Sequence, residues 1–539
     1  MVAALVFYTF LFLLLVVAPA GLILVVLLFL DHERRVWKRV TPFIGPIARK
    51  MAQRPGVLGL RKRFPRITGF VIHRLDPHDS WGLSWTVAVI AITAGLWFFI
   101  GVTAQIVAKD PLVTLDLRLH NAVPLFRTIG MTWFMLALTT LGSPLVLSLL
   151  CLGSALLASA WNRRRLAATL ILALAASGIV STVFKVLLGH ARPIDAIIGA
   201  HAASFPSGHM LSSTVIYGLL AAQLLSSHVR PALRGFGVTF LLLLIVGIGL
   251  SRLYLGVHWP SDLLGSLGLA LVVLACALFF LHYSGPVRWI DTFKIPLGTT
   301  ALRVAGCSVL VLALGATTLL PSRTQMLPIG PPQATRPLGS EALRTSYPSD
   351  LPRWSEDLVG GRMEPVSLVL VGSEEALLGA FTQAGWTKAD LPTPVRVVQE
   401  GLAALRNLPD VSGPATPAFL ADRPQTLTFE KPDSAAPSIR RRHHTRVWRT
   451  GHCLAPRCRP VWVATASYDV GVRFSQGLHL PTHRIDSAID NERALIVTDL
   501  TRIGAKVAAN VTVTPPLQGT NAAGDPFWTD GRAVVLDLP

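Results

Sequence analysis

The chain has 539 residues, more than one domain usually holds, and 51% of them are hydrophobic. With a mean hydropathy of +0.52, this composition excludes an ordinary soluble protein and predicts a membrane part. Lys and Arg number 26 against 9 acids up to residue 320, but 23 against 21 beyond it. Because the basic excess lies in the apolar half, the formal net charge of +19 does not indicate a nucleic-acid partner.

The first predicted element is the apolar run at residues 3–30, which is too long for the core of a cleaved signal peptide. We therefore interpret residues 1–30 as an N-terminal membrane anchor helix. Residues 31–80 hold twelve Lys and Arg against four acids. Loops rich in Lys and Arg stay on the cytoplasmic side, so this segment is predicted to be a basic cytoplasmic loop.

Seven further apolar runs have at least the roughly 17 to 25 residues that a membrane span requires. They cover residues 83–107, 131–160, 166–188, 209–227, 235–253, 259–282 and 299–320. The second run is overlong, and Gly142-Ser143-Pro144 predicts a kink within it. The segment from Asp116 to Asn121, just before that run, has the pattern of an amphipathic surface piece.

The predicted fold is an all-α polytopic membrane domain of about eight spanning helices, followed by a soluble α+β domain. Residues 83–282 form its six-helix core, and residues 299–320 form the eighth span. When the spans alternate from a cytoplasmic 31–80 loop, the basic segment 163–165 and the loops that hold Arg230, Arg234, Arg288 and Lys294 fall on the inner side. That placement agrees with the positive-inside rule.

The chain beyond the last span begins with a segment, residues 321–365, that contains eight prolines and is predicted to be a semi-rigid linker. Residues 366–539 are predicted to form the soluble domain. Its expected strands lie at 366–371, 426–429, 445–449, 461–466 and 507–514. Its expected helices lie at 374–384 and 490–503. Cys453 and Cys458 would form a small disulfide loop if this half faces an oxidising compartment.

Three polar segments interrupt the apolar core, and the same alternation places all of them on the outer face. They read Lys185-Val-Leu-Leu-Gly-His-Ala-Arg192-Pro193, then Pro206-Ser207-Gly208-His209, then Ser251-Arg252-Leu-Tyr-Leu-Gly-Val-His258-Trp-Pro-Ser-Asp262. Ionisable groups near a bilayer are costly unless they pair with one another or serve a site. The three segments therefore predict a functional site.

The residue types in the three polar segments match what hydrolysis of a phosphomonoester requires without a metal. Lys185, Arg192 and Arg252 supply fixed cations for the phosphate oxygens. Ser207 and Gly208 open an apolar helix, whose backbone N–H groups can add donors to the anion.

Two histidines of these segments, His209 and His258, receive different roles. Asp262 lies one helical turn after His258 and can hold its Nδ1–H, which leaves Nε2 free to attack phosphorus. We therefore expect His258 to be the nucleophile and His209 the proton donor to the leaving group. His190 and His201 match no required role and are interpreted as loop residues.

The motifs Lys-x6-Arg-Pro, Pro-Ser-Gly-His and Ser-Arg-x5-His-x3-Asp, in this order, resemble the signature of the type 2 phosphatidic acid phosphatase superfamily. The resemblance covers about residues 83–282. It implies a six-helix core, a phosphohistidine intermediate at His258, an acid at His209, an orienting carboxylate at Asp262, and phosphate binding by the other five residues. It also implies that no metal or other cofactor is required and that the substrates are lipid phosphates or diphosphates.

The soluble half resembles the C-terminal domain named after the LssY protein. The resemblance rests on residues 365–372, 384–386, 442–448 and 482–486, with Asp490 and Arg493. A metal cluster of His443, His444, His483, Asp469 and Asp486 can be imagined, but the spacing matches no standard template, so exposed polar residues are expected. The run Arg440-Arg441-Arg442 could contact anionic lipid headgroups or form a solvated loop.

The sequence therefore predicts a multi-pass enzyme of a bacterial inner membrane, with its active site and C-terminal domain on the periplasmic side. The expected partners are membrane lipids and a lipid phosphate or diphosphate substrate. Phosphatidic acid, phosphatidylglycerol phosphate, undecaprenyl diphosphate and lipid A phosphate all fit the motifs.

Three alternatives stay open. The first is a phosphotransferase that moves a phosphoryl group between lipids. The second is a haloperoxidase-like protein with a similar pocket, although the spans argue against it. The third is a binding or scaffold protein that acts through its soluble domain.

Overall fold

The structure, a computed structural model, describes residues 62–74, 82–108, 111–199, 202–282, 297–323, 335–390, 396, 399, 412–413, 416–433, 441–474 and 481–539. These residues form two compact units. One unit comprises the helical part of the chain up to residue 112 and from Arg127 to Arg323. The other comprises Val113–Phe126 together with the C-terminal half. The predicted anchor helix at residues 1–30 lies outside the described residues.

The first unit is all-helical. Its helices are α4 (Pro65–Arg74), α5 (Leu83–Ala108), α7 (Ile129–Leu141), α8 (Pro144–Ala160), α9 (Arg164–Leu188), α10 (Gly208–Ser226), α11 (Pro231–Tyr254), α12 (Pro260–His282) and α14 (Thr299–Arg323). Among the described residues, six helices are long and apolar enough to cross a membrane, and the pair α7 and α8 is a further candidate. Each of these seven candidates coincides with one of the runs predicted from the sequence.

The pair α7 and α8 is bent by 46°. The bend lies at Gly142-Ser143-Pro144, where the sequence predicts it. Ser143 caps α8 by accepting a hydrogen bond from the backbone N–H of Val146, and Pro144 occupies the first turn, where a missing N–H costs nothing.

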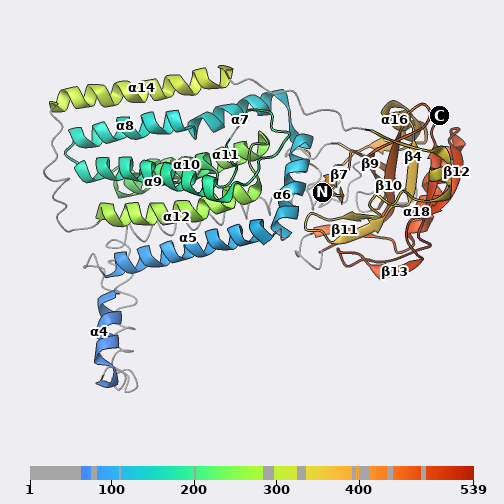
Figure 1. The fold of residues 1–539 in the computed structure, drawn as a ribbon, viewed down its shortest axis with the longest axis horizontal. Coiled ribbons are helices and arrows are strands. Elements are labelled where there is room, and N and C mark those ends of the chain that lie inside the picture. The colour runs from blue at the N-terminus through green and yellow to red at the C-terminus, as the bar shows by residue number, and fades with distance from the viewer. Residues whose placement is uncertain are drawn as a thin grey trace. The chain divides into compact units, whose positions relative to one another are not determined.

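Helices α10 and α12 form the centre of the bundle. Helix α12 packs against α5, α9 and α10, while α11 packs against α7 and α10, and α14 packs against α8 (Figure 1). Most side chains of α12 are buried, whereas α5, α9, α11 and α14 each keep a large exposed apolar surface. Exposed apolar surface on outer helices is expected where lipid, and not water, is the solvent.

The second unit is built on a nine-stranded sheet with the order β12-β15-β4-β10-β9-β8-β5, in which β1 pairs with β9 and β11 pairs with β10. Its strands are β1 (Arg336–Leu338), β4 (Leu368–Val371), β5 (Thr387–Lys388), β8 (Leu427–Pro432), β9 (Arg442–Leu454), β10 (Arg459–Phe474), β11 (Pro481–Ile485), β12 (Lys506–Thr512) and β15 (Arg532–Asp537). The predicted α+β domain is therefore confirmed.

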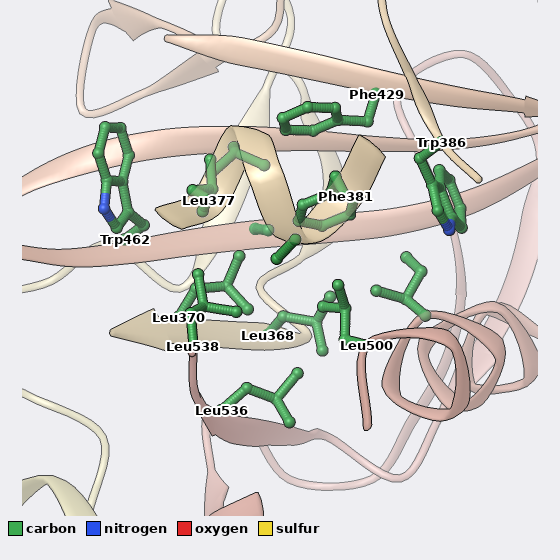
Figure 2. Packing of buried hydrophobic residues seen from close by; sticks show 14 of the residues in the cluster. Leu368, Leu370, Leu377, Phe381, Trp386, Phe429, Trp462, Leu500, Leu536 and Leu538 are labelled. Carbon is green, nitrogen blue, oxygen red and sulfur yellow. The ribbon is translucent and has the colours of Figure 1, made fainter. Parts of the chain in front are cut away.

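Two helices, α16 (Glu374–Gln383) and α18 (Ile489–Arg502), supply apolar side chains to the core of this sheet. Figure 2 shows that core, in which Phe381 of α16 stacks on Phe429 of β8 with ring centroids 4.2 Å apart. Trp386 and Trp462 are almost fully buried in the same cluster. Ser373 caps α16 by accepting the N–H of Ala376.

Two smaller sheets complete the second unit. One is the hairpin of β13 (Leu517–Thr520) and β14 (Pro526–Thr529). The other has the order β3-β2-β6-β7 and consists of β2 (Trp354–Glu356), β3 (Arg362–Pro365), β6 (Phe419–Leu420) and β7 (Arg423–Pro424). Helix α15 (Ser340–Thr345) contributes Leu343 to a second apolar cluster.

Two sequence interpretations need correction. Residues 335–365 are not a linker, because they contribute β1, α15, β2 and β3 to the second unit. Their prolines lie in the short edge strand β1, at the end of β3 or beside turns, where an absent N–H is tolerated. Residues 116–121 are not an exposed surface piece. They lie in α6 (Pro111–Ala122), where Asp116, Arg118 and His120 are buried.

Candidate active site

The three polar segments lie at helix ends of the first unit. Lys185 is in the last turn of α9, and Arg192 follows in the loop after it. Ser207 is the N-cap of α10, and Gly208 and His209 are its first residues. The last segment includes Arg252 in the final turn of α11, His258 between two helices, and Asp262 in the first turn of α12.

Asp262 and His258 form the closest pair of titratable groups in the three segments. Nδ1 of His258 lies 3.0 Å from Oδ2 of Asp262, and the same oxygen accepts the backbone N–H of Trp259 at 2.9 Å. The carboxylate is fully buried, and the imidazole is 2% exposed. A buried carboxylate that accepts these hydrogen bonds fixes the orientation of the ring, as predicted from the four-residue spacing.

Arg192 determines which ring nitrogen of His258 carries the proton. Its Nη1 lies 3.3 Å from Nε2 of His258. A guanidinium group can only donate, so Nε2 must accept, and the proton then resides on Nδ1 and is donated to Asp262. The ring is thus held in the tautomer that leaves a lone pair on Nε2.

The three cations are anchored by oxygen atoms of neighbouring segments. Nζ of Lys185 donates to the carbonyl of Ala203 at 2.6 Å, and Arg192 donates to the carbonyls of Ala202 and Val257. Nη1 of Arg252 donates to Oγ1 of Thr139 at 2.7 Å. Among the described residues, Nε of Arg252 is buried without a hydrogen-bond partner, which leaves a donor for an anion.

His209 is within electrostatic reach of the same groups. It interacts electrostatically with Arg252, His258, Arg192 and Lys185. Ser207 uses its hydroxyl to accept the backbone N–H of Met210, and its own carbonyl accepts from Ser266. A Cβ added at Gly208 would lie 3.2 Å from Oγ of Ser181, so a larger residue there would crowd α9. Phosphate binding by Ser207 and Gly208 stays a prediction.

The loop between Gly189 and Ser204 adds two residues that sequence reasoning did not assign. Nδ1 of His190 lies 3.3 Å from Oδ1 of Asp262, and Oγ of Ser204 donates to the same oxygen at 3.3 Å. Each oxygen of the carboxylate therefore faces one histidine. The sequence signal that could have identified His190 is its position two residues before Arg192, within the first polar segment. His201 lies outside the described residues.

Gly256 shapes the chain between Arg252 and His258. It has a φ of +72°, a backbone angle that residues other than glycine rarely adopt. A Cβ there would also lie 3.0 Å from Nη2 of Arg127 and 3.2 Å from Cα of Ala196. This glycine lets the segment turn between α11 and α12 and bring His258 back to Asp262.

Two of the five polar residues imagined as a metal cluster, His444 and Asp469, are buried, which corrects the expectation that the set is exposed, while Asp486 is exposed. Asp469 is 1% exposed and lies within 3.4 Å of His444, His483 and Arg442. Burial would raise the pKa of Asp469, but the two histidines and Arg442 hold it below its ordinary value. The third arginine of the run at 440–442 is thus buried and also pairs with Glu430, while Arg441 stays exposed.

The described part of the chain contains no group of three or more His, Cys, Asp and Glu residues arranged to hold a metal ion. In the C-terminal half, the guanidinium of Arg442 lies among the acids, where it favours ion pairing over cation binding.

Two family models match the chain. Residues 166–286 match the PAP2 superfamily, and residues 348–533 match the LssY C-terminus. The first range contains all eight residues of the three polar segments to which a role was assigned. The two resemblances inferred from sequence motifs are therefore confirmed.

Three known proteins are similar to part of the chain. YbjG of Escherichia coli (strain K12), a candidate undecaprenyl-diphosphatase by its name, is 41% identical over 111 residues, which are 20% of this chain and 52% of YbjG. Phosphatidylglycerophosphatase B of Bacillus subtilis (strain 168) is 27% identical over 197 residues, or 34% of this chain and 90% of that protein. The chain thus spans about half the length of the first relative.

The third is the crystal structure of a transmembrane PAP2-type phosphatidylglycerolphosphate phosphatase from Bacillus subtilis. It aligns with 24% identity and a TM-score of 0.32, over 34% of this chain and 93% of that structure.

Replacement of Arg252 with Ala should weaken the binding of inorganic phosphate to the purified chain by about ten- to a hundred-fold, the usual effect of losing a charge-assisted hydrogen bond. The matched control is Arg234→Ala, which removes an arginine at the other end of α11 that donates to the backbone carbonyls of Leu225 and Ser227. Titration calorimetry measures both affinities. Equal affinities for the two variants would contradict a phosphate site at Arg252.

Proposed function

We propose that this chain, which carries a PAP2 superfamily domain followed by an LssY C-terminal domain, is a membrane-embedded phosphatase of lipid phosphates or diphosphates. The observation that carries the proposal is the charge balance of the site. Three cations, Lys185, Arg192 and Arg252, are brought around His258 and Asp262, with one carboxylate among them. A phosphate dianion would balance the excess positive charge.

The first half of the reaction transfers a phosphoryl group to the enzyme. Nε2 of His258 attacks phosphorus, and the bond from phosphorus to the lipid oxygen breaks. His209 donates a proton to that leaving oxygen. The three cations stabilise the charge on the non-bridging oxygens, and Asp262 stabilises the imidazole as it becomes positive.

The second half releases the phosphate. A water molecule attacks phosphorus and gives a proton to His209, and the bond between phosphorus and Nε2 breaks. Inorganic phosphate leaves, and both histidines return to their starting protonation states. The names of the two relatives support substrates that end in a phosphate or a diphosphate.

Replacement of His258 with Ala should abolish both phosphate release and covalent labelling of the protein by a ³²P-labelled lipid, because the variant lacks the nitrogen that attacks phosphorus. Acid-labile, base-stable radioactivity on the wild-type chain would identify the phosphohistidine. His228→Ala changes an exposed loop histidine and serves as the control. Labelling that persists in His258→Ala would refute this mechanism.

The pH dependence of the rate follows from the burial of His258, which lies between two spans. Burial lowers the pKa of this imidazole to about 4, although its hydrogen bond to Asp262 opposes the shift. A lowered pKa keeps Nε2 unprotonated at lower pH. We therefore expect kcat/KM to decrease on the acid side with a midpoint near pH 4. Protonation of the substrate phosphate is measured separately from its ³¹P chemical shift, and the rates are corrected for it. An acid limb near pH 6.5 would show that His258 is solvated or does not act as the nucleophile.

We further propose that the chain resides in a bacterial inner membrane with its active site and C-terminal domain on the outer face. The alternation of spans and basic loops motivates this orientation. Two observations support it. Cys453 and Cys458 form a disulfide, which persists in oxidising compartments. Helix α6, which alternation also places outside, belongs to the same compact unit as the C-terminal half.

A reporter enzyme that is active only outside the cytoplasm, fused after Pro539, should be active in whole cells. The same reporter inserted in the basic loop at residue 54 is the matched control and should be silent. The reverse pattern would overturn the orientation.

A further inference from the structure

One face of helix α6 packs against the C-terminal half of the chain. Leu119 and Ala122 form one apolar cluster with Phe419 of β6. The amide of Asn121 donates to the carbonyl of Asp422 at 2.8 Å. A helix that connects two predicted spans is thus packed as part of a domain whose remaining residues lie after the last span.

Arg118 is the centre of this packing, with only 3% of its side chain exposed. Its Nε donates to Oδ1 of Asp422 at 2.9 Å, and its Nη2 pairs with Glu356. Nη1 donates to the carbonyl of Asp357 at 2.6 Å. A buried cation is tolerated only when it is paired in this way. Removal of Arg118 or of an acidic partner leaves an uncompensated buried charge.

Two hairpin turns of the small sheet present polar groups to Arg118. The turn between β6 and β7 has two residues, Ala421 and Asp422, with the positive φ values of 48° and 65° that such a hairpin turn requires. Asp is one of the residues that tolerate this conformation. In the turn between β2 and β3, Gly360 has a φ of 96°, and a Cβ there would lie 3.4 Å from Nη1 of Arg118, so glycine lets this turn approach the guanidinium group.

Within the helical unit, the first residues after the 3₁₀ helix η2 (Val123–Phe126) contact Tyr254, the last residue of α11. Nε of Arg127 donates to the carbonyl of Tyr254 at 3.2 Å. The backbone N–H of Thr128 donates to the hydroxyl of Tyr254 at 3.0 Å. Tyr254 follows Arg252 by two residues and precedes His258 by four.

We propose that the C-terminal domain is an intramolecular clamp on α6, held by Arg118, and that it fixes the position of Tyr254 and thereby of Arg252 and His258. The clamp itself does not depend on the activity of the site. Its effect on the rate rests on the proposed phosphatase function. Arg118 and Tyr254 are positioning residues in this account, because neither touches the reacting atoms.

The test starts from the full chain, with an affinity tag at the N-terminus and a specific protease site inserted after Pro328. After cleavage in detergent, the C-terminal fragment should remain bound to the tagged part in the wild type. Arg118→Gln should reduce the retained fragment about ten-fold or more, as expected when one partner of a buried ion pair is lost. The control Arg336→Gln removes an exposed ion pair with Asp350 and should leave retention unchanged.

Asp422→Asn is the second variant, because Asn tolerates the left-handed turn while it removes the charge that Arg118 needs. It should also release the fragment. Loss of the wild-type fragment on cleavage, or full retention in both variants, would refute the clamp. Retention of the fragment is measured without substrate. The experiment therefore tests the clamp even if the chain has no phosphatase activity.

The kinetic readout separates positioning from folding. Arg118→Gln and Tyr254→Phe should each lower kcat roughly ten-fold with little change in KM, a size typical of coupling between distant positions. Tyr254→Phe should nevertheless retain the cleaved fragment as the wild type does. An unchanged kcat in Arg118→Gln after release of the fragment would show that the clamp does not act on the site.

Discussion

The candidate active site depends on one buried carboxylate. Asp262 has no exposure to solvent, and its two oxygens face His258 and His190, with further hydrogen bonds from Ser204 and the backbone of Trp259. An isolated carboxylate in such surroundings would be too costly to keep charged. These hydrogen bonds, and the nearby cations, stabilise its charge and fix the ring of His258 in the tautomer that leaves Nε2 free.

The proposed phosphate site follows from the same constraint. Lys185, Arg192 and Arg252 are held at helix ends in an apolar bundle, and backbone carbonyls and Thr139 satisfy only part of their donors. A phosphate group would supply both negative charge and acceptors for these donors. In the proposed mechanism, binding and catalysis use the same groups, since the charge that accumulates on phosphate oxygens during transfer would meet cations that are already in place.

The sequence predicted the spans, the kink before Pro144 and the three polar segments, because any charge in an apolar run stands out and phosphoryl transfer needs definite residue types. It did not assign a role to His190, because the contact of this residue with Asp262 depends on the loop folding back onto that carboxylate. It also missed the burial of α6, since the partners of Arg118 at Glu356 and Asp422 lie 238 and 304 residues away in the chain. Local patterns do not encode contacts at such separations.

The most direct test of the account is phosphate release by the purified full chain from phosphatidic acid, phosphatidylglycerol phosphate, undecaprenyl diphosphate and lipid A phosphate, each presented in mixed micelles. The account predicts steady release of inorganic phosphate from at least one of the four, in the presence of a metal chelator. Absence of release from all four, by a chain whose helical content is intact, would contradict it.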